Sequence, residues 1–330
     1  MGNQQYFPFV IVVVMLALGL TLTVDDFKRA ATLRRPLLVA LICQSLLLPT
    51  LCLLIAEAFH LQPTLAIGLM LMAATPGGTT SSVLSHLVRG DLALNVTLTA
   101  INAVLSIFTL PAILAIAMTW FRGDGHFIPL PPGKFVTVFG FVLIPVAIGI
   151  AIRHRLPGFA LRVQQPVRIL AAVLFVVVVV TSIAAGHKTL FNNLGVLSGA
   201  VVCFCAVSLT VGYLVPRWMR LAPRQAIAIS LEIGMHNAAL ALGIALSPQL
   251  LNSMDMAMPA AVYGALAPLI ALTFIVVVRR FDSSFRDTAN ADTISSDTVG
   301  SDTANADTTS SDTAGSDTTS SDTAVDEQPA

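Results

Sequence analysis

The chain has 330 residues, of which 55% are hydrophobic and only 11% are charged. An ordinary soluble domain carries about 25% charged residues, so this composition excludes that class. The formal net charge of zero hides an asymmetry, because residues 287–330 hold ten acidic and no basic side chains, whereas residues 1–286 hold eighteen basic and eight acidic ones, a net charge of +10.

Long apolar segments separated by short polar loops fill residues 1–286. A bilayer core about 30 Å thick needs about 20 apolar residues per helix. We therefore predict an all-α, polytopic membrane helix bundle with about nine transmembrane helices and no separate soluble domain. The first segment reads as a retained helix, since no basic residue precedes it and no small-residue cleavage site follows. The predicted spans are 6–23, 36–59, 64–85, 91–120, 133–152, 166–186, 191–215, 224–246 and 257–278.

The Lys and Arg residues indicate the orientation of these spans. With the N-terminus outside, the inner loops with the adjoining span ends hold 15 of the 18 Lys and Arg residues, including Arg162 and Arg168 around the start of the sixth span, and the outer loops hold three. Cytoplasmic loops are enriched in these residue types. We expect a multi-pass protein of the inner (plasma) membrane, with the N-terminus outside and the C-terminus in the cytoplasm.

Two spans combine helix-breaking residues with polar side chains. The third contains Pro76, Gly77 and Gly78 before a run of Thr and Ser, and the eighth contains Gly234 between Glu232 and a His-Asn pair. Proline removes a backbone donor, and paired glycines add backbone freedom, so the third helix should break there. Freed backbone groups at membrane depth are tolerated only when they are buried in protein or line a cavity. Both breaks are therefore candidate binding sites.

Glu232 is the only acidic residue in the middle of a predicted span, and His236 follows it by one helical turn. A carboxylate at the bilayer centre is costly unless it is paired or coordinated. Because no span has a Lys or Arg at its centre, a bound cation is the simplest partner; the alternative is a protonated structural Glu. Asn95 and Thr99 share one face of the fourth helix and Gln44 lies within the second. Such oxygen-bearing side chains suit a hard cation such as sodium.

The two halves of the bundle also share a pattern. The third and eighth spans are the interrupted ones, and the fourth and ninth each contain a proline, Pro111 and Pro268. Spans 1–4 then pair with spans 6–9, with the fifth as a connector, and the two repeats run in opposite directions. Interrupted helices at matching positions of inverted repeats indicate a transporter binding site.

Beyond the bundle, an Asp-Thr pair recurs every five residues, eight times between Asp287 and Thr323. The remaining residues there are mostly Ala, Asn, Ser and Gly, with almost nothing apolar, so the segment cannot bury enough apolar surface to offset its chain entropy. We predict one transmembrane domain over residues 1–286 and a disordered acidic tail over 287–330. A calcium-binding repeat is the alternative, but the glycine pattern of calcium-binding solenoids is absent.

These motifs resemble the bile acid:sodium symporter family across residues 6–280. The resemblance rests on Leu20–Leu22 with Asp26-Phe27, Gln44 before Pro49, Pro76–Thr79, Arg89–Asp91 with Ala93-Leu94, and Glu232–Asn237. It implies a panel formed by helices 1, 5 and 6, and a core in which the two broken helices cross.

The resemblance also implies ligand sets. The first sodium site would use Ser81, Ser82, Asn95, Thr99 and Glu232. The second would use Gln44, Glu232, His236 and the carbonyls of Ile233 and Met235. The substrate would lie close to Thr79, Thr80 and Asn237. The family commonly has Asn where Ser82 stands and Ser where Asn95 stands. The same two side-chain types are therefore present at swapped positions of one site, which would preserve the ligation of sodium. The family commonly has Gln where His236 stands, so the second site departs from the family pattern.

The sequence thus predicts sodium-coupled symport of a small organic anion, bile-acid-like or a small carboxylate, by alternating access. A sensor or receptor built on a transporter fold, or a proton-coupled carrier, is the alternative. We expect no enzyme and no catalytic residue, because Glu232 and His236 lack a third metal ligand and no Gly-x-Ser-x-Gly elbow occurs. The expected partners are the substrate, sodium at two sites and the lipid bilayer, without nucleic acid or an obligate protein partner.

Overall fold

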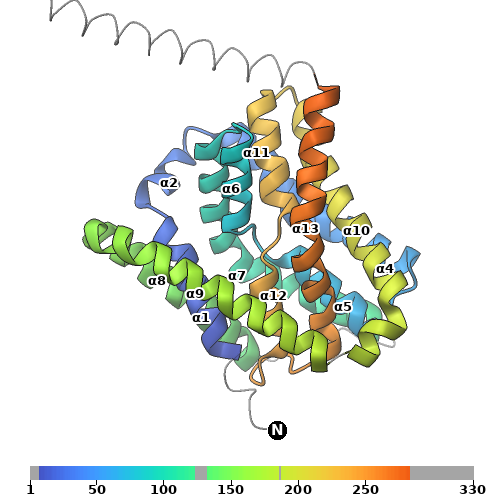
Figure 1. The fold of residues 1–330 in the computed structure, drawn as a ribbon. Coiled ribbons are helices and arrows are strands. Elements are labelled where there is room, and N and C mark those ends of the chain that lie inside the picture. Colours follow the sequence, from blue (N-terminus) through green and yellow to red (C-terminus); the bar gives the residue numbers. More distant parts are fainter. Residues whose placement is uncertain (1–6, 123–131, 186, 283–330) are drawn as a thin grey trace, which may run out of the picture. The chain divides into compact units, whose positions relative to one another are not determined.

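The computed structural model describes residues 7–122, 132–185 and 187–282, which form helices joined by short connections (Figure 1). Within these ranges the secondary structure is helical apart from one isolated bridge, so the predicted all-helical class is confirmed. The chain divides into a unit of Met1–Phe281 and a unit of Asp282–Ala330. The predicted tail over 287–330 lies outside the described residues and stays a prediction.

The helices share a strongly apolar character, and five helical stretches in the described part of the chain are long enough to cross a membrane. The helices of the first, third and eighth predicted spans are only nine to 15 residues long, so the count of nine spans stays a prediction. The elements are α1 (Phe7–Thr21), α2 (Val24–Arg29), α3 (Arg34–Ile42), η2 (Cys43–Leu47), α4 (Leu48–Ala58), α5 (Pro63–Ala74), α6 (Thr79–Leu87), α7 (Leu92–Arg122), α8 (Pro132–Arg155), α9 (Pro157–Ala185), α10 (His187–Trp218), α11 (Pro223–Gly234), α12 (Ala238–Leu246) and α13 (Met254–Phe281).

One predicted boundary is wrong. The sixth span was expected to begin at residue 166, but α9 begins at Pro157 and continues through Pro166. Proline fits the first turn of a helix, where its missing N–H costs nothing, and Pro157 takes that position. Arg162 therefore lies within a helix and not in the loop between the fifth and sixth predicted spans, and Arg168 lies well inside α9 and not at the start of a span.

Three of the four half-helices at the interruptions are almost entirely buried, whereas α6 is partly exposed. Every residue from Leu65 to Ala74 in α5 and from Ala226 to Gly234 in α11 is buried, as is nearly all of α12. By contrast, only 17% of the apolar window of α9 is buried, although its mean hydropathy is high. An apolar helix that is exposed along most of its surface suits contact with lipid. Helices α5, α11 and α12 thus form the centre of the bundle.

Helix α1 connects this centre to α8 and α9. It packs most extensively against α8, and also against α9 and α12 (Figure 1). A methyl group on Gly19 would stand 2.4 Å from the Val146 carbonyl oxygen, and one on Gly149 would stand 2.7 Å from the Gly19 Cα. Only glycine allows two helix backbones to approach this closely. The contact fixes α8 beside α1 and so places α9 next to the buried half-helices.

The second predicted span contains a wider helical turn that the sequence did not reveal. Between α3 and α4, residues Cys43–Leu47 form a π-helical turn, in which the Leu48 N–H bonds to the Cys43 carbonyl. Pro49 follows directly, and its ring excludes the carbonyl one turn earlier from ordinary α-helical bonding. Such π-turns are frequent at functional sites. This one holds the buried side chain of Gln44.

Candidate functional site

The two helix interruptions lie against each other. A short extended segment separates α5 from α6, and another separates α11 from α12, so the predicted break in the third span is confirmed. Gly77 and His236 form an antiparallel bridge, and the Asn237 N–H donates to the Pro76 carbonyl over 3.0 Å. The two segments thus satisfy part of each other's backbone hydrogen bonding at a place where water is scarce.

Glu232 lies beside this crossing and is fully buried. Its Oε2 accepts hydrogen bonds from the Ser81 and Thr99 hydroxyls, both over 2.7 Å. Its Oε1 has no hydrogen-bond partner among the described residues. A methyl group on Gly77 would stand 2.4 Å from that oxygen, so the absent side chain of Gly77 provides the space that the carboxylate occupies.

Ser82 and Asn95 form a second polar pair near the carboxylate. The Ser82 hydroxyl donates to the Asn95 Oδ1 over 2.8 Å, and the Asn95 Nδ2 donates to the Ala228 carbonyl over 3.0 Å. Of the residues predicted for the first sodium site, the structure joins Ser81 and Thr99 to Glu232 directly. It joins Ser82 and Asn95 to each other through their side chains.

Gln44 and His236 approach the crossing from a different direction. The Gln44 Nε2 donates to the carbonyls of Ala73 and Thr75, over 3.4 and 3.2 Å, and the Gln44 Oε1 has no partner among the described residues. The His236 Nδ1 lies 3.2 Å from the same Thr75 carbonyl. A carbonyl oxygen only accepts, so Nδ1 carries the hydrogen and Nε2, which has no described partner, is left as an acceptor.

The two carbonyls predicted for the second site lie at the end of α11. In a continuous helix the Asn237 N–H would bond to the Ile233 carbonyl. It bonds to Pro76 instead, so this N–H is withdrawn from the Ile233 oxygen. Met235 has φ −117° and ψ 76°, outside the helical range, as its place within the interruption requires.

Aromatic side chains support His236 in a way that the sequence analysis missed. Phe204 stacks on the His236 ring with a centroid distance of 5.2 Å and an interplanar angle of 15°. The Tyr263 hydroxyl donates to the Gly234 carbonyl over 2.5 Å and accepts from the His236 N–H over 3.4 Å. Aromatic residues within apolar spans give no sequence signal for such a role, because they equally suit ordinary packing.

Asn102 is another residue that the predicted ligand sets omit. It is 2% exposed, and neither atom of its side-chain amide has a hydrogen-bond partner among the described residues. It lines a void of about 10 Å³ together with Gln44. A void of this size holds about one water molecule, and an unpaired buried amide is costly. The position of Asn102 as a polar residue in the middle of the predicted fourth span was the sequence signal that could have identified it as a candidate site residue.

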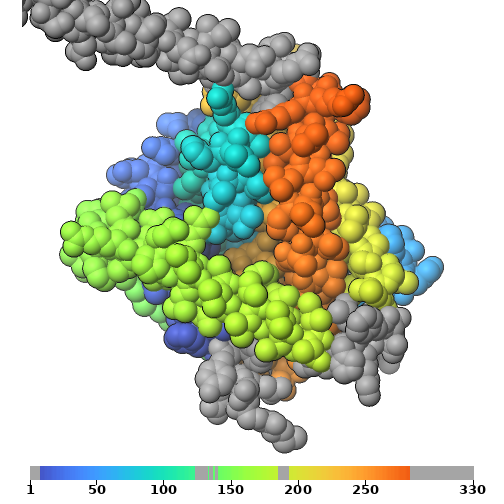
Figure 2. Space-filling view, viewed as in Figure 1, coloured from blue at the N-terminus to red at the C-terminus, as the bar shows by residue number. Residues whose placement is uncertain are grey.

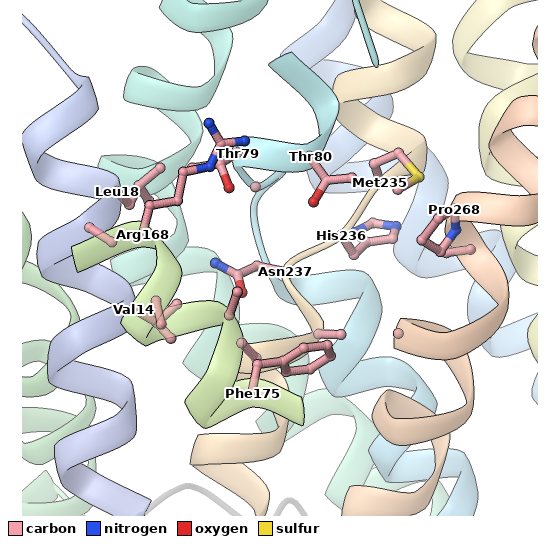
Figure 3. A pocket seen from close by; sticks show the side chains of 18 of the residues that line it. Val14, Leu18, Thr79, Thr80, Arg168, Phe175, Met235, His236, Asn237 and Pro268 are labelled. Carbon is pink, nitrogen blue, oxygen red and sulfur yellow. The ribbon is translucent and has the colours of Figure 1, made fainter. Parts of the chain in front are cut away.

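A larger cavity of about 310 Å³ opens beside the crossing. Thr79, Thr80 and Asn237, the residues predicted to contact substrate, all line it, and His236 does so as well. Arg168 reaches the same cavity from α9 (Figure 3). The surface is visibly hollowed between α6, α9 and α13 (Figure 2), the helices that supply much of the lining. The breaks thus bring the predicted substrate residues together at one cavity.

Comparison with known proteins gives a consistent picture. The family model described as "Sodium Bile acid symporter family" matches residues 8–193. An uncharacterized sodium-dependent transporter of Bacillus subtilis is 27% identical over 247 residues, which cover 73% of this chain and 74% of the relative.

Eukaryotic relatives are also similar. A probable chloroplastic sodium/metabolite cotransporter of Oryza sativa subsp. japonica is 29% identical over 255 residues, covering 75% of this chain and 59% of the relative. The human sodium/bile acid cotransporter 4 is 29% identical over 262 residues, covering 77% of this chain and 59% of the relative. The chain therefore spans about three fifths of the length of these two relatives.

Proposed function

The chain belongs to the sodium bile acid symporter family, whose model matches more than half of it, and from that membership we propose that it carries a small organic anion across a membrane together with sodium. The observation that carries the proposal is the buried Glu232 carboxylate, which receives the Ser81 and Thr99 hydroxyls beside two interrupted helices. The names of the relatives, a sodium-dependent transporter and sodium cotransporters, support the coupling ion.

The electrostatics of Glu232 favour a cation as its partner. The carboxylate makes no ion pair with any described residue, and one of its oxygens has no hydrogen-bond partner there. A buried charge without a counter-charge is strongly unfavourable, so a bound cation would stabilise the ionised form. Hydroxyl, amide and carbonyl oxygens around it suit sodium better than a soft metal.

We assign two sodium sites that share Glu232. The first comprises Ser81, Ser82, Asn95, Thr99 and Glu232. The second comprises Gln44, Glu232, His236 and the carbonyls of Ile233 and Met235, and the unpaired Gln44 Oε1 and His236 Nε2 support it. The imidazole nitrogen of His236 is a softer ligand than an amide oxygen, and sodium prefers hard oxygen ligands. The second site should therefore bind sodium more weakly than the first.

The substrate would lie in the cavity beside the crossing. Helix α6 begins at the cavity with Thr79, and α12 begins there after its N-cap residue Asn237. Because the N-terminus is the positive end of a helix dipole, both helix ends favour an anion in the cavity. The cavity volume of about 310 Å³ falls at the lower end of the range of about 300–1,000 Å³ for ligand pockets. A small carboxylate therefore fits this cavity better than a steroid-sized anion.

The proposed architecture and cycle follow from the same features. Nine spans in two inverted repeats, with a panel of α1, α8 and α9, would rock against the crossing helices and expose the cavity to either side in turn. The N-terminus would lie outside and the C-terminus in the cytoplasm, with residues 287–330 as a disordered tail. The membrane is the plasma membrane, and neither a catalytic step nor an obligate protein partner enters the cycle.

Uptake in proteoliposomes tests the proposal. The purified protein is reconstituted, and uptake of labelled carboxylates of three to six carbons is measured under an inward sodium gradient, an inward proton gradient with choline, or no gradient. Accumulation that requires sodium supports symport. Accumulation that follows the proton gradient would indicate a proton-coupled carrier, and binding without accumulation would indicate a sensor.

A further inference from the structure

Arg168 occupies an unusual place on α9. It lines the 310 Å³ cavity at the crossing and also a neighbouring cavity of about 340 Å³. The two cavities share only Leu18, Thr79 and Arg168 as lining residues. Arg168 therefore stands at their junction, and it is the only Lys or Arg that lines either of them. Figure 3 shows its side chain extending from α9 towards Thr79.

The guanidinium lacks a counter-charge within the described part of the chain. Arg168 is partly buried, and it makes no hydrogen bond or ion pair with another described residue. By contrast, Arg155 at the end of α8 and Arg162 on α9 are exposed. A guanidinium offers five donors and stays charged, so a partly desolvated one favours an anion that can accept two parallel hydrogen bonds.

The rest of the cavity indicates what such an anion would look like. Besides Arg168, the lining offers the Thr79 and Thr80 hydroxyls and the Asn237 amide, whereas Val14 and Phe175 belong to an apolar remainder. A ligand for this lining carries one charged group and a short apolar body. An uncharged analogue of the same shape would leave the guanidinium unpaired, which costs affinity.

We propose that Arg168 binds the carboxylate of the transported anion and so makes the cavity selective for small monocarboxylates with an apolar body. This inference rests on the proposed function and names its substrate class. Because Arg168 comes from α9 while Thr79 comes from α6, the bound anion contacts both sides of the cavity. These two helices are not among the extensively packed pairs, so a bridging anion would draw them together.

Ligand binding to matched variants tests the proposal. The probes are 4-methyl-2-oxopentanoate and its uncharged amide, added in sodium to the purified full-length protein, with dissociation constants measured by calorimetry. In the wild type the acid should bind more tightly than the amide. In Arg168→Gln this preference should fall about tenfold or more, as the loss of a charged hydrogen-bond partner implies. Arg168→Lys, which keeps the charge but not the paired donors, should lie between the two.

Arg162→Gln serves as the control, because Arg162 lies on the same helix, is exposed and lines neither cavity. It should keep the wild-type preference. If Arg168→Gln weakens the binding of acid and amide equally, Arg168 has a packing role. If the preference for the acid is unchanged, the arginine is directed to lipid headgroups. Either result overturns the proposal. So does a wild type that binds acid and amide equally. Stabilisation by sodium alone, measured by thermal unfolding, tests the sodium sites and the integrity of each variant separately.

Discussion

Replacing Gly77 by alanine would disturb the candidate sodium sites with a single methyl group. That methyl would stand 2.4 Å from the Glu232 Oε1, 2.5 Å from its Cδ and 2.7 Å from its backbone oxygen. Ordinary van der Waals contact begins at about 3.4 Å, so the groups must separate by about 1 Å. The carboxylate could rotate away, but the backbone oxygen can move only if the end of α11 moves with it.

The expected magnitude follows from these contacts. Forcing an extra methyl into a packed interior costs about 1–3 kcal/mol. A carboxylate displaced by about 1 Å would also lose its 2.7 Å bonds from Ser81 and Thr99, and each hydrogen bond to a charged group contributes about 1.5–3 kcal/mol. Losing one such contact at the sodium site corresponds to an affinity about ten- to a hundredfold weaker.

Thermal unfolding of the purified protein, with and without sodium, measures both effects. Gly77→Ala should lower the melting temperature and reduce the increase that a given sodium concentration produces. The matched control is Gly78→Ala, because a methyl on this neighbouring glycine would have no atom within 4 Å. It should keep the wild-type melting temperature and sodium response. A Gly77→Ala protein with both wild-type properties would refute the placement of sodium beside Glu232.

Three further predictions concern coupling, the tail and the topology. Glu232→Gln should abolish sodium-driven uptake in proteoliposomes while the protein stays folded, because a neutral amide cannot balance bound cations; wild-type sodium dependence would contradict this. Truncation after Arg286 should leave uptake unchanged, and a loss at equal reconstitution would give the tail a function. Single cysteines at Gln62 and Gln249 should react with an impermeant maleimide from outside, and one at Ala222 only from inside; reversed labelling would overturn the orientation.

The parts of the fold that could be predicted from the sequence have local causes. Pro76 and Gly77 act through their own backbone chemistry, so the interruption of the third span could be located from residue types alone. Glu232 stood out because a carboxylate in an apolar stretch is costly wherever the helix packs. The start of α9 was misplaced because the span was located from its apolar residues, whereas the helix begins earlier, at Pro157.

The remaining features depend on contacts between distant parts of the chain. The bond from Tyr263 to the Gly234 carbonyl joins residues 29 apart, and the Phe204 ring meets His236 only once the helices have packed. Nothing in the local sequence distinguishes these aromatic residues from lipid-facing ones. Arg168 was counted as a marker of sidedness, and only the arrangement of α9 beside the cavities reveals a second use for its charge.

The mutual pairing of the two interruptions has a consequence for biogenesis. Thr75 and His236, which meet at the crossing, lie 161 residues apart in the chain. At about 5–20 residues per second, a ribosome needs about eight to thirty seconds to synthesise that stretch. During this interval the interruption around Pro76 has already been synthesised, but Asn237, which bonds to the Pro76 carbonyl, has not yet left the ribosome. The third span should therefore remain next to the translocon or a chaperone, shielded from lipid, until the eighth span arrives.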